Sequence, residues 1–452
     1  MSNGQGQRSS IFSGLLLILL GVLFLLARFD PNLGIWHVFW RYWPIVIILW
    51  GLAKLVDHLG AQHAAQGRPP LLNGSEAALL VLVFFVLAGM GLYSKIREKH
   101  PDLNFDVGFF NHEATQSQEL PAKTIPAGSH VALTTVRGSI TAHAGDGNDL
   151  LVSVNETAEG ASESSARDRM KNLQVVIEQT SDGYSVHPLN LEDTGGHVTV
   201  DLDVTLPKKV SVTAESDRGD IHISGIASAV TATAQHGDIE VHDVGSDVSA
   251  KMTKGDTRIT GVAGNVSLAG HGNEIEISEV KGNAAVDGDF FGPIRVRSVA
   301  GTVRYRSQRA DLTLVGVRGR LELDSGQIEI SDVSGLAKLV THKMDIEVEN
   351  VSGHLDIADT KGDIKIRFSQ PPREDINVAD DSGEVDLTLP SNSSFEISAI
   401  SQSGEVQSEF EDSSLKLQND NGTGRLSGKI GTGGPKIHIT TSYGTLYLRK
   451  SS

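Results

Sequence analysis

One pattern recurs three times at a spacing of 18 residues: RGDIHISGI at 218–226, HGDIEVHDV at 236–244 and KGDTRITGV at 254–262. A shorter form, KGDIKI, returns at 361–366. In each copy apolar and polar residues alternate, which is typical of a strand with one buried face. Gly-Asp supplies a corner, because Gly accepts a positive φ and Asp hydrogen-bonds its own backbone. The segment therefore predicts short strands joined by tight corners.

The repeat extends beyond these copies as columns of apolar residues. The first column steps by 18, 18, 18, 19, 18, 16, 18, 18 and 21 residues, through Ile221, Ile239, Thr257, Ile275, Ile294, Leu312, Ile328, Ile346, Ile364 and Val385. The second lies two residues later and includes Leu314, and the third includes Val317. Two more columns occupy the other half of the repeat and include Leu321 and Leu323. Five columns in step predict stacked coils that bury the apolar side chains.

These columns predict an all-β fold, a single-chain β-solenoid of about 18-residue coils over residues 125–450. Strands of neighbouring coils lie about 4.8 Å apart, so ten coils would form a rod about 50 Å long. The outward residues between the first two columns form a ladder of partly alternating charge. We interpret this ladder as a solvated face that fixes register, with a binding strip for a glycan or protein as the alternative. Its members are His222, Glu240, Arg258, Glu276, Arg295, Thr313, Glu329, Glu347, Lys365 and Asp386.

The segment before the repeats is less regular. Residues 94–124 are polar and contain prolines, which predicts a linker. Residues 162–173 form the one expected helix of this part, opened by a Ser cap. Strands are expected at 174–178, 184–187 and 197–207.

Residues 1–93 predict an α-helical membrane domain with three spans, at about 11–28, 36–56 and 77–93. All four tryptophans, Trp36, Trp40, Trp43 and Trp50, lie in the second segment, as in an aromatic belt at the membrane interface. A cleaved signal peptide is the weaker alternative for the first span, because only Arg8 precedes it and no small-residue cleavage site follows. We therefore expect a multi-pass protein of the bacterial cytoplasmic (inner) membrane.

Three spans would place the N-terminus and the large domain on opposite sides of the membrane. Arg and Lys residues near the spans divide five to three, in favour of a large domain in the cytoplasm. This margin is small, and the sequence leaves the side of the large domain open.

Charge and cysteine content exclude several functions. Residues 1–100 carry eight Lys/Arg and four Asp/Glu, whereas the remainder carries 31 and 52. Such an acidic domain would repel phosphate backbones, so we expect no nucleic-acid partner. The chain contains no cysteine, which excludes disulfides, thiolate metal sites and cysteine nucleophiles.

Two parts of the chain resemble known families. The stretch GLLLILLGVLFLL from Gly14, followed by Trp43, Pro44 and Gly51, resembles the LiaI/LiaF-like transmembrane module over residues 11–56. The segment LDVTLPKKVSV from Leu202, the G-D-I units and the closing GTGGPKI from Gly431 resemble the putative-adhesin β-solenoid family (DUF4097) over residues 125–450. The second resemblance implies a β-solenoid, whereas fold alone does not imply function.

Candidate chemistry is sparse. His222, His236, His242 and His271 occupy different edges of the predicted rod, so we expect surface histidines and no metal site. The corner residues Asp220, Asp238, Asp256, Asp311, Asp345 and Asp363 offer one carboxylate per coil, which favours turn formation over calcium binding. A β-helix glycosidase or lyase would need grouped carboxylates or basic residues beside long loops. The coils are short and regular, and their main departures lie near Arg309 and in the turn 370–376.

We therefore expect no catalytic residue and no cofactor. The partners implied are the lipid bilayer and either a protein partner or further copies of the chain. The resemblances favour a role in envelope interaction, scaffolding or envelope-stress regulation. The alternatives are a surface adhesin that binds a glycan or a neighbouring protein and, more remotely, a carbohydrate-active enzyme.

Overall fold

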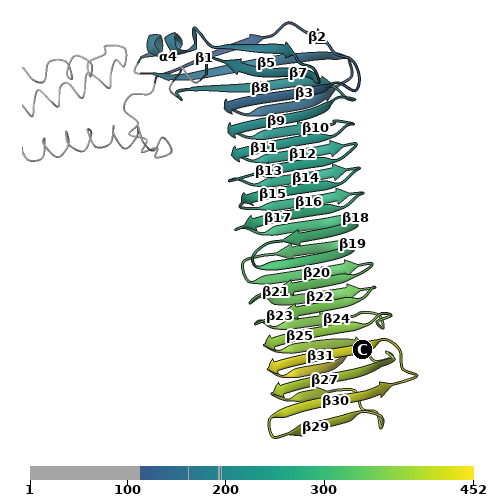
Figure 1. The fold of residues 1–452 in the computed structure, drawn as a ribbon. Helices are drawn as coiled ribbons and strands as arrows, with labels where there is room; N and C mark the ends of the chain where they lie inside the picture. Colours follow the sequence, from purple (N-terminus) through teal and green to yellow (C-terminus); the bar gives the residue numbers. More distant parts are fainter. Residues whose placement is uncertain (1–111, 161, 192–193, 195, 452) are drawn as a thin grey trace, which may run out of the picture. The chain divides into compact units, whose positions relative to one another are not determined.

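The computed structural model describes residues 112–160, 162–191, 194 and 196–451 (Figure 1). These residues belong to the second of two compact units, Gly108–Ser452. The predicted spans and the four tryptophans lie outside the described residues. Within the described part of the chain, no helix is both long and apolar enough to cross a membrane.

The rod begins with an irregular first section. Its elements are β1 (His112–Glu119), β2 (Lys123–Thr124), β3 (His130–Arg137), β4 (Ile140–Gly145), β5 (Asp149–Gly160), α4 (Glu163–Met170), β6 (Gln174–Gln179), β7 (Gly183–Leu189) and β8 (Val198–Pro207). The expected helix and strands are confirmed, and the Ser162 hydroxyl caps α4 by accepting a bond from the Ser165 amide. The linker prediction is wrong for residues 112–124, because β1 pairs along its whole length with β5.

Regular coils follow, each contributing one strand to each of two faces. The first face holds β10 (Ile221–Ser224), β12 (Ile239–Val244), β14 (Thr257–Val262) and β16 (Ile275–Val280). The second face holds β9 (Ser211–Arg218), β11 (Val230–His236), β13 (Val248–Met252), β15 (Val266–Gly272) and β17 (Ala284–Phe290). Strands on each face pair in parallel with those of the next coil, so the predicted β-solenoid of 18-residue coils is confirmed.

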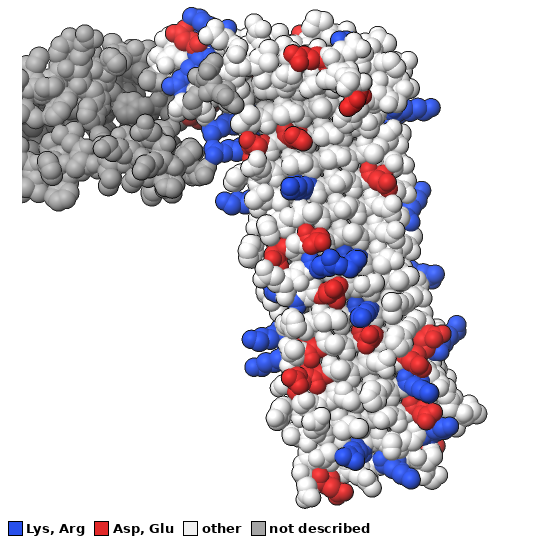
Figure 2. All heavy atoms as spheres, viewed as in Figure 1, with Lys and Arg blue, Asp and Glu red and all other residues white. Residues whose placement is uncertain are grey.

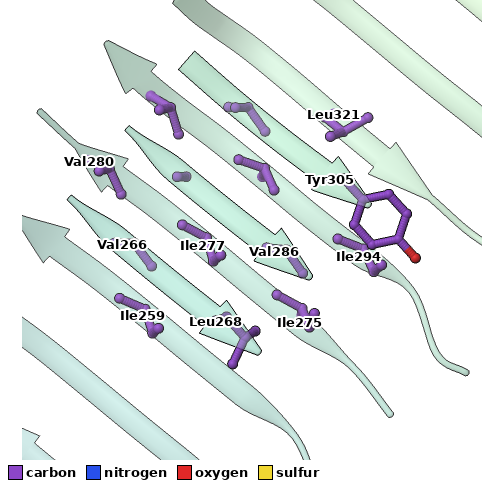
Figure 3. Close-up of a cluster of buried hydrophobic side chains, with 14 of the residues drawn as sticks. Ile259, Val266, Leu268, Ile275, Ile277, Val280, Val286, Ile294, Tyr305 and Leu321 are labelled. Carbon is purple, nitrogen blue, oxygen red and sulfur yellow. The ribbon is translucent and has the colours of Figure 1, made fainter. Parts of the chain in front are cut away.

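The apolar columns form the core. Ile221, Ile239, Thr257 and Ile275 stack in register, and each is almost completely buried. Figure 3 shows Ile259, Ile277 and Val286 among the side chains directed into the same interior. Apolar burial at about 25 cal/mol per Å² drives this stacking.

One coil in the middle of the rod runs backwards. Strand β18 (Ile294–Arg306) covers both faces in the usual direction, and β19 (Ala310–Leu323) returns antiparallel beside it. Strand β20 (Gln327–Val333) is antiparallel to β19 and restores the original direction. Tight turns close both hairpins, with the amide of Ser307 bonded to the Ala310 carbonyl and that of Asp324 bonded to the Gln327 carbonyl.

This reversal corrects the predicted columns. Leu323 and Leu321 occupy the first two columns, where Leu312 and Leu314 were expected, and Leu314 and Leu312 occupy the fourth and fifth. Val317 keeps its predicted place between Val299 and Val333. The apolar spacings of this coil are nearly the same in both directions (2, 3, 4 and 2 residues forwards, 2, 4, 3 and 2 backwards), and register shifts beside Val317 absorb the one-residue difference. Either direction therefore fills the same core positions. Asp311 accordingly lies in a strand, opposite Arg306, and not at the predicted corner.

The coils then continue to the C-terminal end. They comprise β21 (Ala337–Thr341), β22 (Asp345–Val351), β23 (Leu355–Asp359), β24 (Ile364–Arg367), β25 (Ile376–Ser382) and β26 (Val385–Pro390). The last section holds β27 (Phe395–Ser403), β28 (Val406–Ser408), β29 (Lys416–Asp420), β30 (Thr423–Ile430), β31 (Lys436–Tyr443) and β32 (Leu446–Ser451). The final strands β31 and β32 insert between β25/β26 and β27/β28, which places the last strands of the chain inside the stack.

Close packing between coils explains the Gly-Asp corners. Gly237 has φ +147°, and a Cβ there would lie 2.3 Å from the carbonyl oxygen of Gly219 in the preceding coil. The Asp220 carboxylate accepts a 2.8 Å bond from the Asp238 amide, and Asp238 accepts one from Asp256. Each corner aspartate therefore bonds the next coil, whereas the sequence suggested a bond within its own turn.

Two aspartates lie buried on neighbouring coils. Asp359 and Asp380 are paired in register on β23 and β25, and each side chain is 6% exposed. Thr341 donates a 2.7 Å bond to Asp359, whereas Oδ1 of Asp380 has no hydrogen-bond partner. Burial, with a further contribution from the Asp359 charge, raises the pKa of Asp380 to about 6.

A cysteine pair tests the reversed coil. Arg304 and Thr313 are directly opposite in the antiparallel β18–β19 pair, at a Cα spacing of about 5 Å that suits a disulfide. In this cysteine-free chain, the double variant Arg304→Cys/Thr313→Cys should crosslink on oxidation, as detected by mass spectrometry of the linked peptides. A uniformly parallel stack would instead pair residue 313 with residue 295, so crosslinking of Arg295→Cys/Thr313→Cys alone would contradict the structure.

Substitution of a corner glycine tests the packing between coils. Gly237→Ala should lower the unfolding free energy by about 3 kcal/mol, because the added methyl group meets the Gly219 carbonyl. Gly326→Ala is the matched control, since no atom lies within 4 Å of its added Cβ. Thermal unfolding followed by circular dichroism measures both variants, and equal midpoints would contradict the close contact.

The buried carboxyl makes a prediction about pH. The folded-state pKa of Asp380 is raised from 3.8 to about 6, so the folded chain binds this proton more tightly than the unfolded chain. The contribution of this proton to stability is therefore fully present below about pH 4 and is lost as the pH rises through 6. At pH 7.5, Asp380→Asn should be more stable than the wild type by about 1–3 kcal/mol.

Urea titrations at pH 4 to 7.5 measure this difference, which should vanish at the acid end. Asp356→Asn, on the partly exposed outward side of β23, is the control. A difference for Asp380→Asn that does not change with pH would show that the carboxyl titrates normally.

Candidate functional site

The predicted outward ladder lies on the first face of the rod. His222, Glu240, Arg258, Glu276 and Arg295 are consecutive partners in register, and Glu329, Glu347 and Lys365 follow. Between the two groups stands Glu322, which is opposite both Arg295 and Glu329. The expected Thr313 lies on the second face, because the coil that carries it is reversed.

Most charged members of the ladder are bonded to one another or to adjacent side chains. His222 Nδ1 lies 3.1 Å from Glu240 Oε2, and Arg258 Nε lies 3.1 Å from Glu276 Oε2. Arg295 bridges Glu274 and Glu322, and these bonds raise its guanidinium pKa. Figure 2 shows acidic and basic groups interspersed on the viewed face. These pairs support register, each contributing roughly 0–1 kcal/mol.

A polar groove of about 680 Å³ opens on the rod where successive coils turn between the two faces. Its charged lining residues are Arg318, Asp332 and Arg373. The rest of the lining comprises Val333, Ser334, Asn350, Val351, Ser352, Phe368, Ser369, Gln370, Pro371 and Pro372.

The reversed coil supplies Arg318. Between Val317 and Leu321 the register of β19 against β20 shifts, so three residues of β19 oppose two of β20. Such a bulge bends a strand locally and redirects a side chain. The bulge places Arg318 on the groove, one residue after the buried Val317.

A long turn supplies Arg373. Residues 368–375 connect β24 to β25, whereas only residues 245–247 connect β12 to β13. The amide and hydroxyl of Ser369 donate bonds of 2.9 and 2.7 Å to Oδ1 of Asn350, which anchors the start of the turn. Asp375 accepts a 2.7 Å bond from the Lys436 amide at its end. Pro371 and Pro372 restrict the backbone between these anchors.

Both groove arginines are unpaired. Arg318 and Arg373 are exposed, and neither forms an ion pair or hydrogen bond with the described residues. Asp332 accepts a 3.4 Å bond from the Asn350 amide group. The lining therefore carries two positive charges and one negative charge on a domain that is otherwise strongly acidic.

The two irregularities visible in the sequence thus meet in one groove. The interrupted step near Arg309 marks the reversed coil, and the turn 370–376 forms the opposite side. Sequence reasoning identified both irregularities but selected neither Arg318 nor Arg373, because their proximity depends on which coils stack between them. The ladder residues predicted from the sequence do not line the groove.

The other candidate residues stay apart. His222 pairs with Glu240, and His271 lies opposite Asp289 on the second face. Among the described residues, no group of three or more His, Asp or Glu side chains could hold a metal ion. The groove lining contains a single carboxylate, whereas glycoside hydrolysis ordinarily uses a pair.

Comparison with known proteins agrees with this architecture. The family model for Toastrack DUF4097 matches residues 129–449, which is most of the chain. The chain belongs to the Toastrack DUF4097 family. A second model, the LiaI-LiaF-like transmembrane region, matches residues 11–55, as the resemblance at the N-terminal end predicted. No curated protein matches this chain.

One similar solved structure is a "putative cell adhesion protein" from Clostridium sporogenes, which is 8% identical in sequence. The match covers 74% of this chain and 100% of that chain, with a TM-score of 0.16. A "putative adhesin" from Bacteroides fragilis has 12% identity, covers 74% of this chain and 97% of that one, and has a TM-score of 0.19. Identities and TM-scores this low do not carry a function from one protein to another.

Proposed function

We propose that this Toastrack protein is a non-enzymatic, multi-pass protein of the bacterial cytoplasmic membrane whose β-solenoid acts by binding a partner of the cell envelope. The match of residues 11–55 to the LiaI-LiaF-like transmembrane region supports membrane association. The three spans at 11–28, 36–56 and 77–93 would anchor the chain. Part of the proposal is a role in envelope maintenance or stress sensing, which the same likeness favours.

The main support for a binding function is the groove between Arg318 and the 368–375 turn. Elsewhere on the first face most charged ladder side chains pair with one another, and single cations such as Arg297 and Lys365 stand on the regular sheet outside this groove. In the groove two guanidinium groups without partners among the described residues line one concavity, Arg318 from β19 and Arg373 from the anchored 368–375 turn. Two cationic side chains that converge on one concavity, with no protein partner among the described residues, are available to a ligand.

Lateral binding is better supported than end-to-end polymerisation. At one end of the rod, β1 covers β5 with a largely exposed, polar outer strand. At the other end, β29 pairs only with β30 and carries Lys416 and Asp420 at its two ends. Charged and polar edge strands oppose the addition of further strands.

Complementation in the host bacterium tests this function. A strain that lacks the gene should be more sensitive to cell-wall-directed antibiotics, and the wild-type gene should restore resistance. Arg318→Gln/Arg373→Gln should fail to restore it, because the groove loses both unpaired charges. Arg304→Gln, which removes an exposed charge on the second face, should restore resistance fully. Equal membrane levels of all variants are verified by immunoblot, and restoration by the double variant would contradict a binding role for the groove.

A further inference from the structure

We propose that the groove binds a carboxylate-bearing oligosaccharide. This inference rests on the proposed function, that the rod acts by binding, and adds the chemical class of the ligand. It follows from the length of the groove, its charge and the polar character of its walls.

The groove is long enough for several sugar rings. Arg318 lies on β19, and the turn that carries Arg373 follows β24. On the first face these strands are separated by β20 and β22, in the paired order β19–β20–β22–β24. Three strand spacings correspond to about 14 Å. The lining of the groove therefore extends over about three strand spacings along the rod, which favours an oligomer over a single small anion.

Charge selects an acidic ligand. The lining carries Arg318 and Arg373 against Asp332 alone, so it is positive on an acidic rod. Arginine binds carboxylates through two parallel hydrogen bonds, and such charge-assisted bonds are about twice as strong as neutral ones. Both guanidinium groups have their donors available, because no described residue pairs with them.

The walls between the arginines suit sugar hydroxyls. Ser334, Ser352 and Gln370 present hydroxyl and amide groups, and Ser352 and Gln370 make no side-chain hydrogen bond within the described residues. Asp332 can accept bonds from ligand hydroxyl groups. The serines recur on successive coils, at roughly the spacing of successive sugar rings in an extended chain.

An acidic peptide fits less well. Strands β20 and β22 are paired on both sides, so no free edge is available for a peptide to extend the sheet. The apolar lining residues Val333, Val351 and Phe368 are at most 6% exposed and Pro372 is buried, which leaves Pro371 as the exposed apolar residue of the lining. Peptide interfaces ordinarily depend on pockets for apolar anchors.

Binding of defined oligosaccharides to the full-length protein in detergent micelles tests the inference. The probes are tetramers that contain uronic, sialic or muramic acids, each paired with its carboxyl methyl ester, and hexaglutamate represents an acidic peptide. We expect calorimetry to detect at least one acidic tetramer, with its methyl ester bound about tenfold more weakly or worse. Arg318→Gln and Arg373→Gln should each weaken binding by about tenfold, whereas Arg304→Gln should leave it unchanged.

Several results would overturn the inference. These are the absence of binding by every acidic tetramer, equal binding of the ester, an unchanged affinity in the double arginine variant, or stronger binding of hexaglutamate. An equal loss in Arg304→Gln would show that the attraction is non-specific. Circular dichroism verifies that each variant is folded.

Membrane topology gives an independent test. Envelope glycans lie outside the cytoplasm, so the inference requires the C-terminus to lie on the outer side of the membrane. Protease added to intact cells should therefore cleave at the C-terminus, and a reporter fused after Ser452 should show an external location. The charge distribution around the spans favours a cytoplasmic C-terminus. That location would overturn the proposal that the ligand is an envelope glycan. It would leave the proposed binding function intact, and complementation by the groove variants tests that function separately.

Discussion

The contact between one coil and the next is the constraint on which the whole rod depends. At the corners the backbones approach so closely that Gly237 leaves no room for a Cβ beside the Gly219 carbonyl. The same proximity lets a corner aspartate accept the amide proton of the following coil. Ladder hydrogen bonds, buried columns and corner carboxylates all use this one spacing. Longer coils keep the same contacts by placing the extra residues in a turn: across the 21-residue step Ile364 still pairs with Val385, and Asp363 still accepts a 3.0 Å bond from the Glu384 amide.

The reversed coil shows what this constraint leaves free. The core requires apolar side chains at five positions per coil. These positions can be filled by a chain that runs through the coil in either direction. The apolar residues of this coil are spaced almost symmetrically, so β19 can enter the stack antiparallel and still fill every column once the bulge beside Val317 absorbs a one-residue difference. Its polar side chains cannot be interchanged in this way. Glu322 joins the charged ladder in place of Thr313, and the bulge beside Val317 places Arg318 in the groove.

The regular coils and the proposed binding groove therefore lie in different parts of the rod. Where coils repeat, most charged ladder side chains pair with one another, and the cations that do not, such as Lys254 and Lys365, stand singly on a regular surface. Where the repeat is broken, by the reversed coil and by the 368–375 turn, polar groups are left without partners within the described residues. Both breaks lie on the same edge, a few coils apart, and together they make a concave, positively charged surface on an acidic domain. Recognition here depends on departures from the repeat.

The sequence by itself determined the β-solenoid, its coil length, the residues of its core and the short helix, because burial imposes a period that alternation and spacing reveal. It also located both irregularities. Only the tertiary structure decided the direction of the coil at 310–323, the insertion of the last strands inside the stack and the pairing of β1 with β5. The reason is that apolar periodicity reports which side chains point inward and carries no information about strand direction or neighbours. The groove depends on those neighbours, so Arg318 and Arg373 became a site only in the folded rod.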